Sequence, residues 1–252
     1  MKTISVAGLP VTVFWKDNVE NDIISCFSKH HTVSFSGYSI DTLHLMKIIP
    51  NLFQMREVND YFLCDGRGFY YFMKMLGVKG VSKLSLPNLT MMLIHMAAKE
   101  GKSIFVLGAT EESNRMALVK LNTEYGVSYV YGRNGYYSES EEQSIVDLIN
   151  NKSPDILLLG MSSPKKDEFV YRWKSHLKVK IIVHCGGMID VISGKTKLYP
   201  RWVKNLCLAG LFRFIQEPLR LRRDFFNAIL GTILACRIVL QRKPYSEVAE
   251  LE

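Results

Sequence analysis

The feature that most constrains the fold is a regular alternation, between residues 32 and 187, of short apolar runs with stretches of helical spacing. The apolar runs, several of which end in or near glycine, occupy residues 32–36, 61–64, 103–108, 127–132, 155–161 and 180–187. Residues 109–126 and 139–152 lie between such runs and have the spacing of helices. This alternation is typical of a parallel sheet covered by helices on both faces. The sequence therefore predicts an α/β fold.

Residues that directly follow the predicted strands are the first candidates for a functional site, because open sheets of this kind bind ligands beyond the carboxyl ends of their strands. Asp65 follows the run at 61–64, within "CDGRG". It is a candidate catalytic aspartate, although Asp-Gly is also a common turn signal and the turn is the favoured interpretation. Gly108 stands at a strand–helix junction, where a phosphate can bind the helix N-terminus. A tight turn is the favoured explanation of Gly108, and Thr110 is predicted to cap the helix.

Two later loops also carry candidate binding residues. The loop "GMSSPKKDE" at 160–168 contains Lys165 and Lys166, which either hold an anion or form the solvated start of a helix. In "HCGGMID", Gly187 allows a ligand to approach the backbone, and Asp190 either accepts hydrogen bonds from sugar hydroxyls or caps a helix. His184, inside the strand, is interpreted as a core residue. Neither a metal-ligand spacing nor an Asp-x-Asp motif occurs, so no metal site is predicted.

Positive charge is concentrated near the C-terminus. Residues 195–243 contain eleven Lys or Arg and two acids, an excess of nine positive charges in a chain of net charge +8. Such an asymmetry points to an anionic partner. The longest uncharged run, 225–236, is shorter than the roughly 20 residues that a membrane-spanning helix needs. A nucleic-acid-binding segment has no use for this apolar run, so we expect no nucleic acid as a partner.

A helical projection places aromatic and aliphatic side chains on one face of residues 218–243 and arginines on the other. This pattern predicts an amphipathic helix lying on an anionic membrane surface. The alternative is a helix packed against the body of the fold. We accordingly expect a core over residues 1–195 and a basic, amphipathic appendage over residues 196–252.

The five cysteines are scattered and form no CxxC pair, which indicates a reducing compartment. The N-terminal stretch "MKTISVAGLPVTVFW" has no small-residue cleavage site. It is therefore predicted to form a strand and not a signal peptide.

Five short motifs, in this order and spacing, together resemble those of the WecG/TagA/CpsF glycosyltransferases, glycosyltransferase family 26. The resemblance extends from about residue 4 to about residue 225. The motifs are Asp65-Gly66, "GYYSESEE" (135–142), "PKKDE" (164–168), "GGMID" (186–190) and "FRFIQEPLR" (212–220).

The resemblance implies a Rossmann-like core and a membrane-associating appendage. It implies an inverting transferase that takes a sugar, N-acetylmannosamine-type or related, from a UDP-sugar. The acceptor would be a polyprenyl-diphosphate-linked sugar in cell-surface polysaccharide biosynthesis, at the cytoplasmic face of a bacterial-type membrane. Neither a cofactor nor a metal is implied. Asp65 would be the base, and Arg213, Arg220 and Arg223 would stabilise the departing UDP.

The candidate substrate-binding residues are Ser34, Ser36, Gly108, Lys165, Lys166, Gly187 and Asp190. The chain departs from the family pattern at two of them. Ser36 stands where the family has Asn, and Lys166 stands where it has Gln. An alternative hypothesis is therefore a nucleotide-sugar-binding protein at the membrane surface that does not catalyse transfer.

Overall fold

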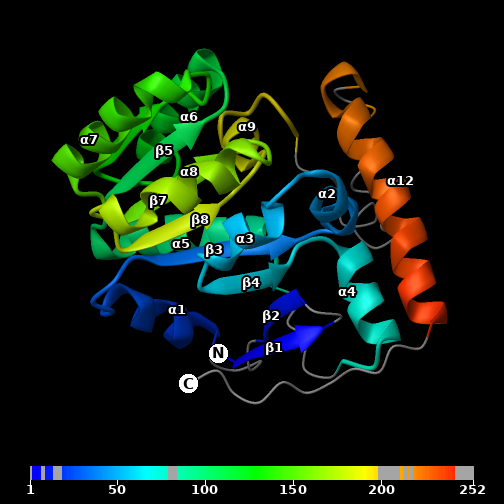
Figure 1. Cartoon of the computed structure of the whole chain (residues 1–252). Coiled ribbons are helices and arrows are strands. Elements are labelled where there is room, and N and C mark those ends of the chain that lie inside the picture. Colours follow the sequence, from blue (N-terminus) through cyan, green and yellow to red (C-terminus); the bar gives the residue numbers. More distant parts are fainter. Residues whose placement is uncertain are drawn as a thin grey trace.

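A computed structural model describes residues 2–6, 9–13, 19–78, 84–197, 211–212, 215 and 218–241. Its main element is a six-stranded sheet in the order β4-β3-β8-β7-β5-β6, in which every neighbouring pair is parallel (Figure 1). The strands are β3 (Val33–Tyr38), β4 (Tyr61–Cys64), β5 (Ile104–Gly108), β6 (Val130–Arg133), β7 (Ile156–Gly160) and β8 (Ile181–His184). The predicted parallel sheet is confirmed.

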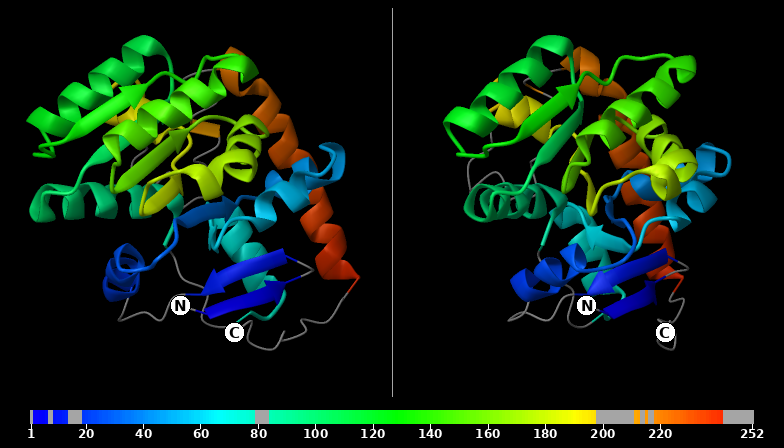
Figure 2. Two further views of the ribbon diagram at one scale, coloured as in Figure 1. Left: turned by 60° about the vertical axis from the view of Figure 1, so that its left-hand side comes forward. Right: turned by 90° about the vertical axis from the view of Figure 1, so that its left-hand side faces the viewer.

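Helices cover both faces of this sheet, as Figures 1 and 2 show. One face packs against α1 (Val19–Phe27), α5 (Leu86–Glu100), α6 (Glu111–Thr123) and α9 (Met188–Ile192). The other face packs against α7 (Glu142–Lys152) and α8 (Lys165–Trp173), and α3 (Leu52–Glu57) packs on α8. Short 3-10 segments occupy Glu139–Glu141 and Lys174–His176. The predicted cap of α6 is confirmed, because Thr110 Oγ1 accepts a hydrogen bond from Ser113 N at 3.2 Å.

The connections after neighbouring strands leave the sheet toward opposite faces. The chain passes from β3, through α2 (Thr42–Ile48), to α3 on one face and from β8 to α9 on the other. It passes likewise from β7 to α8 and from β5 to α6 on opposite faces. Diverging connections open a crevice at the carboxyl edge of the sheet, where ligands of such folds bind.

A smaller unit at the end of the large sheet contains the N-terminal strands. The stretch predicted as one strand forms two, β1 (Lys2–Val6) and β2 (Leu9–Val13), which pair antiparallel (Figure 2). The hairpin contacts β4, and Phe62 N donates a hydrogen bond to Thr12 Oγ1 at 2.8 Å. Leu9 and Val11 join a second apolar cluster with residues of α2 (Thr42–Ile48) and α4 (Arg67–Met75).

The C-terminal helix α12 (Pro218–Leu240) stands beyond the carboxyl ends of β3 and β4, in contact with α2 and α4 (Figure 1). Its inner face carries the buried residues Asn227, Gly231 and Ala235. A Cβ added at Gly231 would lie 2.0 Å from the carbonyl oxygen of Ile40, so only glycine permits this contact. The predicted helix is confirmed, and it packs on the fold through the face that was predicted to be polar.

The face of α12 that was predicted to be apolar points outward. Phe226 is 53 % exposed, Ile229 43 % and Ile233 47 %. Among the residues that the structure describes, no helix combines the length and the apolar character needed to cross a bilayer. The exposed apolar residues therefore lie on one side of a helix whose other side is fixed to the protein.

Candidate functional site

Asp65 lies at the carboxyl edge, where β4 ends. Its backbone N–H donates to the carbonyl oxygen of Tyr38 at 2.9 Å, which ties it to the last residue of β3. A Cβ added at Gly37 would lie 3.1 Å from Asp65 Cβ, so the two strand ends are in close contact. Gly66 has φ +82°, a conformation that favours glycine. The turn interpretation of Asp-Gly is thus correct, and the same turn places the carboxylate at the edge where ligands bind.

The end of β8 contributes the second part of the edge. Gly186 has φ +55°, and Gly187 immediately precedes α9. Asp190 lies in α9 and is buried, so its carboxylate belongs to the protein interior just behind this turn. A Cβ added at Gly160, the last residue of β7, would lie 3.1 Å from the carbonyl oxygen of Gly186. The ends of β7 and β8 are therefore packed backbone against backbone.

Gly108 is required by packing. A Cβ added there would lie 2.6 Å from backbone atoms of Gly160. Glu111 and Glu112 occupy the first turn of the following helix. Two carboxylates stabilise that helix end and would repel a phosphate. The turn interpretation of Gly108 therefore accounts for the residue without a ligand.

The two lysines of the 160–168 loop point to different partners. Lys165 Nζ donates to the carbonyl oxygens of Gly135 at 2.9 Å and Tyr137 at 2.8 Å, and lies 3.6 Å from the centroid of the Tyr137 ring. Its ammonium group thus holds the loop that follows β6. Lys166 is half-buried, and within the described part of the chain its Nζ makes neither a hydrogen bond nor an ion pair. Of these two lysines, Lys166 is the one whose ammonium group has no hydrogen-bond partner among the described residues and can bind a ligand.

A buried polar cluster beneath this edge was not predicted from the sequence. Arg56, from α3, has a side chain 2 % exposed, and Asp167, from α8, has one that is 0 % exposed. Arg56 Nη1 lies 3.5 Å from Asp167 Oδ1, and Arg56 Nη2 donates to Ser36 Oγ at 2.9 Å and to the carbonyl oxygen of Gly37. Ser36, a predicted substrate-binding residue, is therefore buried, and its hydroxyl accepts this hydrogen bond. An arginine in "LFQMRE" follows no pattern that would have revealed the pairing.

The protonation states of this cluster follow from burial and neighbouring charge. Burial raises the pKa of Asp167, but Arg56, Lys166 and a hydrogen bond from Ser163 Oγ at 2.6 Å together bring that pKa below its usual value. Burial lowers the pKa of His184 to about 3, so this core histidine is neutral at pH 7. The Arg56–Asp167 pair is then electrically balanced, and the charge of Lys166 is in excess.

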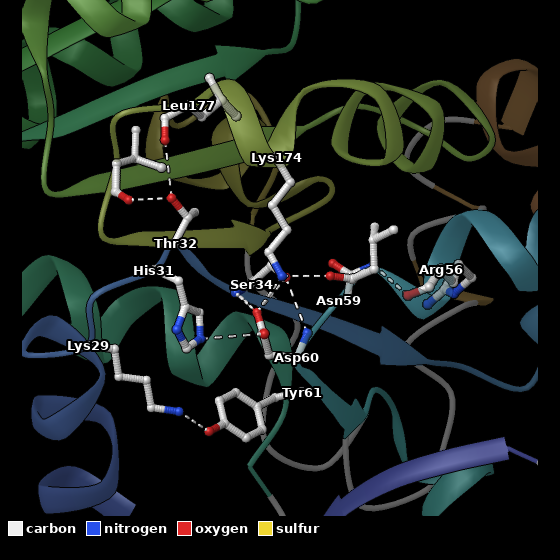
Figure 3. A network of polar contacts seen from close by, with 12 residues as sticks. Lys29, His31, Thr32, Ser34, Arg56, Asn59, Asp60, Tyr61, Lys174 and Leu177 are labelled. Carbon is white, nitrogen blue, oxygen red and sulfur yellow. Dashed lines mark hydrogen bonds and ion pairs between the residues drawn. The ribbon is translucent and has the colours of Figure 1, made fainter.

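Ser34 lies apart from the other candidates, near the amino end of β3 (Figure 3). It lies four positions before Tyr38, about 13 Å along an extended strand. Its N–H and hydroxyl donate to Asp60 Oδ2 at 2.7 and 3.0 Å, and Lys174 Nζ donates to the same oxygen at 2.7 Å. The partner of Ser34 is thus Asp60, which directly precedes β4, and their contact lies at the amino ends of β3 and β4, opposite the carboxyl edge.

The predicted arginines lie at the start of the C-terminal helix or before it. Arg220 and Arg223 are in the first two turns of α12, three residues apart and hence on neighbouring positions of one helix face. Arg213 lies outside the described residues. No group of three or more His, Cys, Asp or Glu side chains that could hold a metal ion occurs in the part of the chain that the structure describes.

The fold and the edge together define an open α/β protein of Rossmann-like type, with its candidate site at the carboxyl ends of β3, β4, β7 and β8. A family model described as "Glycosyl transferase WecG/TagA/CpsF family" matches residues 4–245, nearly the whole chain. The chain belongs to this family and is a glycosyltransferase.

Proposed function

We propose that this protein is an inverting glycosyltransferase of cell-surface polysaccharide biosynthesis. The donor is a UDP-sugar, N-acetylmannosamine-type or related, and the acceptor is a polyprenyl-diphosphate-linked sugar. The observation that carries this proposal is the position of Asp65 at the carboxyl edge, beside the end of β3, in a chain of this family.

In the proposed reaction an acceptor hydroxyl attacks the anomeric carbon of the donor sugar. The Asp65 carboxylate takes the hydroxyl proton as the new C–O bond forms, and the bond between the sugar and UDP breaks. Negative charge then accumulates on the departing diphosphate and requires fixed positive charge nearby. We assign this role to Arg213, Arg220 and Arg223.

For the donor we assign the turn at the end of β8. Gly187 lets the nucleotide sugar approach the backbone, and we assign to Asp190, buried directly behind that turn, the support of the turn that receives the donor. Lys166 lies on the neighbouring loop after β7. Ser34 has no part in this assignment, because it lies at the opposite end of β3.

The membrane is assigned to the outer face of α12. Phe226, Ile229 and Ile233 are exposed there, and Arg222 and Arg237 on the same helix are exposed as well. Exposed apolar side chains flanked by arginines suit the interface of an anionic bilayer. The sheet would then lie at the cytoplasmic face, with its carboxyl edge near lipid-linked substrates.

Replacing the outer face of α12 is expected to release the protein from membranes. The triple variant Phe226→Ser, Ile229→Ser, Ile233→Ser removes apolar area that would be buried in lipid, worth at most about 1.5–3 kcal/mol per side chain. Binding to vesicles that contain anionic lipid should weaken by at least roughly 100-fold in a co-sedimentation assay. The matched control is Val119→Ser, Leu148→Ser, Tyr171→Ser, three exposed apolar residues on α6, α7 and α8. Equal binding by both triple variants would show that lipid contacts another surface.

Sugar transfer itself is tested with a panel of UDP-sugars and a synthetic polyprenyl-diphosphate-linked acceptor on vesicles. We expect one UDP-sugar to yield an elongated acceptor whose new linkage, read by NMR, has the anomeric configuration opposite to that of the donor. Retention of configuration would contradict the single displacement. UDP binding by calorimetry, with no turnover on any acceptor, would favour the alternative of a non-catalytic nucleotide-sugar-binding protein.

A further inference from the structure

The buried Arg56–Asp167 pair joins three parts of the fold that meet at the carboxyl edge. Arg56 comes from α3 and donates to Ser36 and Gly37 of β3, while Asp167 lies in the first turn of α8. Asp167 also accepts a hydrogen bond from Ser163 Oγ at 2.6 Å, across the loop after β7. The Asp167 carboxylate thus connects Ser163, in the loop after β7, with Arg56 of α3.

Lys166 lies within the segment from Ser163 to Asp167. Its N–H donates to the carbonyl oxygen of Ser162 at 3.2 Å, and the N–H of Asp167 donates to that of Pro164 at 2.8 Å. Successive residues of a helix are rotated by about 100°. Asp167 points into the core and Lys165 toward the loop after β6, so the Cα–Cβ bond of Lys166, between them, has a defined direction.

The positive charge of Lys166, second to burial, acts to lower the pKa of two residues at the end of β8, Cys185 and His184. Burial raises the pKa of the Cys185 thiol to about 12, and Lys166 counteracts this rise. Burial and then Lys166 lower the pKa of His184. Lys166 lies in the first turn of α8, directly after the loop that follows β7. A Cβ added at Gly160, the last residue of β7, would lie 3.1 Å from the carbonyl oxygen of Gly186, so this loop adjoins the turn where the donor is assigned.

The charges of this cluster do not cancel, because Arg56 and Lys166 are both positive and Asp167 is the buried carboxylate that both of them influence. Asp167, the buried carboxylate that follows Lys166, is already balanced by Arg56. His184 is neutral, and neither of its ring nitrogens has a hydrogen-bond partner within the described residues. A half-buried ammonium group that supplies the excess positive charge of such a cluster is suited to bind an anion.

We propose that the Arg56–Asp167 pair is a positioning device that holds Lys166 against the diphosphate of the nucleotide donor. The inference rests on the proposed function, because it takes the donor to be a UDP-sugar. Lys166 then acts beside the assigned arginines in distinguishing a nucleoside diphosphate from the nucleoside alone. Asp167 and Arg56 act only through Lys166 and contact no substrate.

The test is calorimetric titration of the full chain with UDP and, separately, with uridine, in buffer that contains EDTA. For Lys166→Gln we expect the Kd of UDP to rise roughly 10- to 100-fold, as for the loss of a charged hydrogen bond. The Kd of uridine should change less than about twofold, because uridine lacks the phosphates. The control is Lys180→Gln, which changes the net charge equally but lies just before β8, at the amino end of the sheet.

The positioning role is tested with Ser163→Ala, which keeps both buried charges and removes only the hydrogen bond to Asp167. We expect it to raise the Kd of UDP by about threefold, with no effect on uridine. In the Lys166→Gln background the same substitution should add nothing, because residues that act through one another are not additive. A merely structural role would weaken UDP and uridine together, and in both backgrounds.

The outcomes separate this inference from the proposed function. An unchanged Kd of UDP in Lys166→Gln overturns the inference and leaves glycosyl transfer intact. Selective loss of UDP affinity in a protein that transfers no sugar supports the inference and contradicts the transferase proposal. A wild-type protein that binds no UDP overturns both.

Discussion

Asp65→Asn is expected to lower kcat for sugar transfer by roughly 10²- to 10⁴-fold, the range of a positioned general base. The amide has the shape of the carboxylate but cannot take the proton of the acceptor hydroxyl. The backbone N–H of Asp65 still donates to Tyr38, so the turn between β4 and α4 should be preserved. We therefore expect the Kd of UDP, measured by calorimetry, to stay within about twofold of the wild-type value.

The control for this substitution is Asp147→Asn, which removes the same charge from an exposed position on α7. It should transfer sugar at the wild-type rate. If Asp65→Asn transfers sugar as fast as the wild type, Asp65 is not the base. If it loses UDP affinity in proportion to kcat, the carboxylate acts in binding and the mechanism above is wrong.

Arg56→Met is expected to lower the free energy of unfolding by about 3–5 kcal/mol, the usual cost of leaving one member of a buried ion pair alone. Asp167 has no exposed surface, and Arg56 is its ion-pair partner at 3.5 Å. Without the guanidinium, the buried carboxylate has to stay charged without that partner or take up a proton. Urea unfolding at pH 7, followed by circular dichroism, measures the loss.

Two further variants make this result specific. The double variant Arg56→Met, Asp167→Leu removes both charges and should recover most of the stability, since apolar replacements of buried pairs are often neutral. Glu124→Gln breaks an exposed pair with Lys120 and should cost less than about 0.5 kcal/mol. A cost for Arg56→Met as small as that for Glu124→Gln would mean that Asp167 is not held by Arg56.

Local pattern predicted the sheet well. The run at 61–64 forms β4 over those same residues, and Thr110 caps α6 as its position before two acids indicates. The run at 127–132 forms a strand only from Val130, since the segment before it closes the preceding helix through a hydrogen bond from Val127 N to the carbonyl oxygen of Leu121. The N-terminal stretch was predicted as one strand and forms two, because alternation alone does not locate a chain reversal.

The candidate site was predictable only in part. The sequence placed Asp65, Gly187 and Lys166 at one edge because the ends of parallel strands meet there, and the structure has them after β4, β8 and β7, while their roles stay predictions. Arg56 and Asp167 were missed because their contact depends on the packing of α3 on α8, which no local pattern encodes. Ser34 was assigned to the site from the family pattern, whereas hydrogen bonds to Asp60 explain its presence.

The inward position of Gly231 on α12 has a consequence for how the sequence can vary. The buried contacts of this helix are made by residues such as Gly231 and Ala235, while Phe226, Ile229 and Ile233 touch little of the protein. These three side chains are therefore not needed to pack α12 on the fold. Packing of the helix against the second apolar cluster is made by Leu234, Ile238 and Val239. In the proposed membrane-bound protein, the three outer residues can be exchanged to suit bilayers of different lipid composition while the protein interior stays the same.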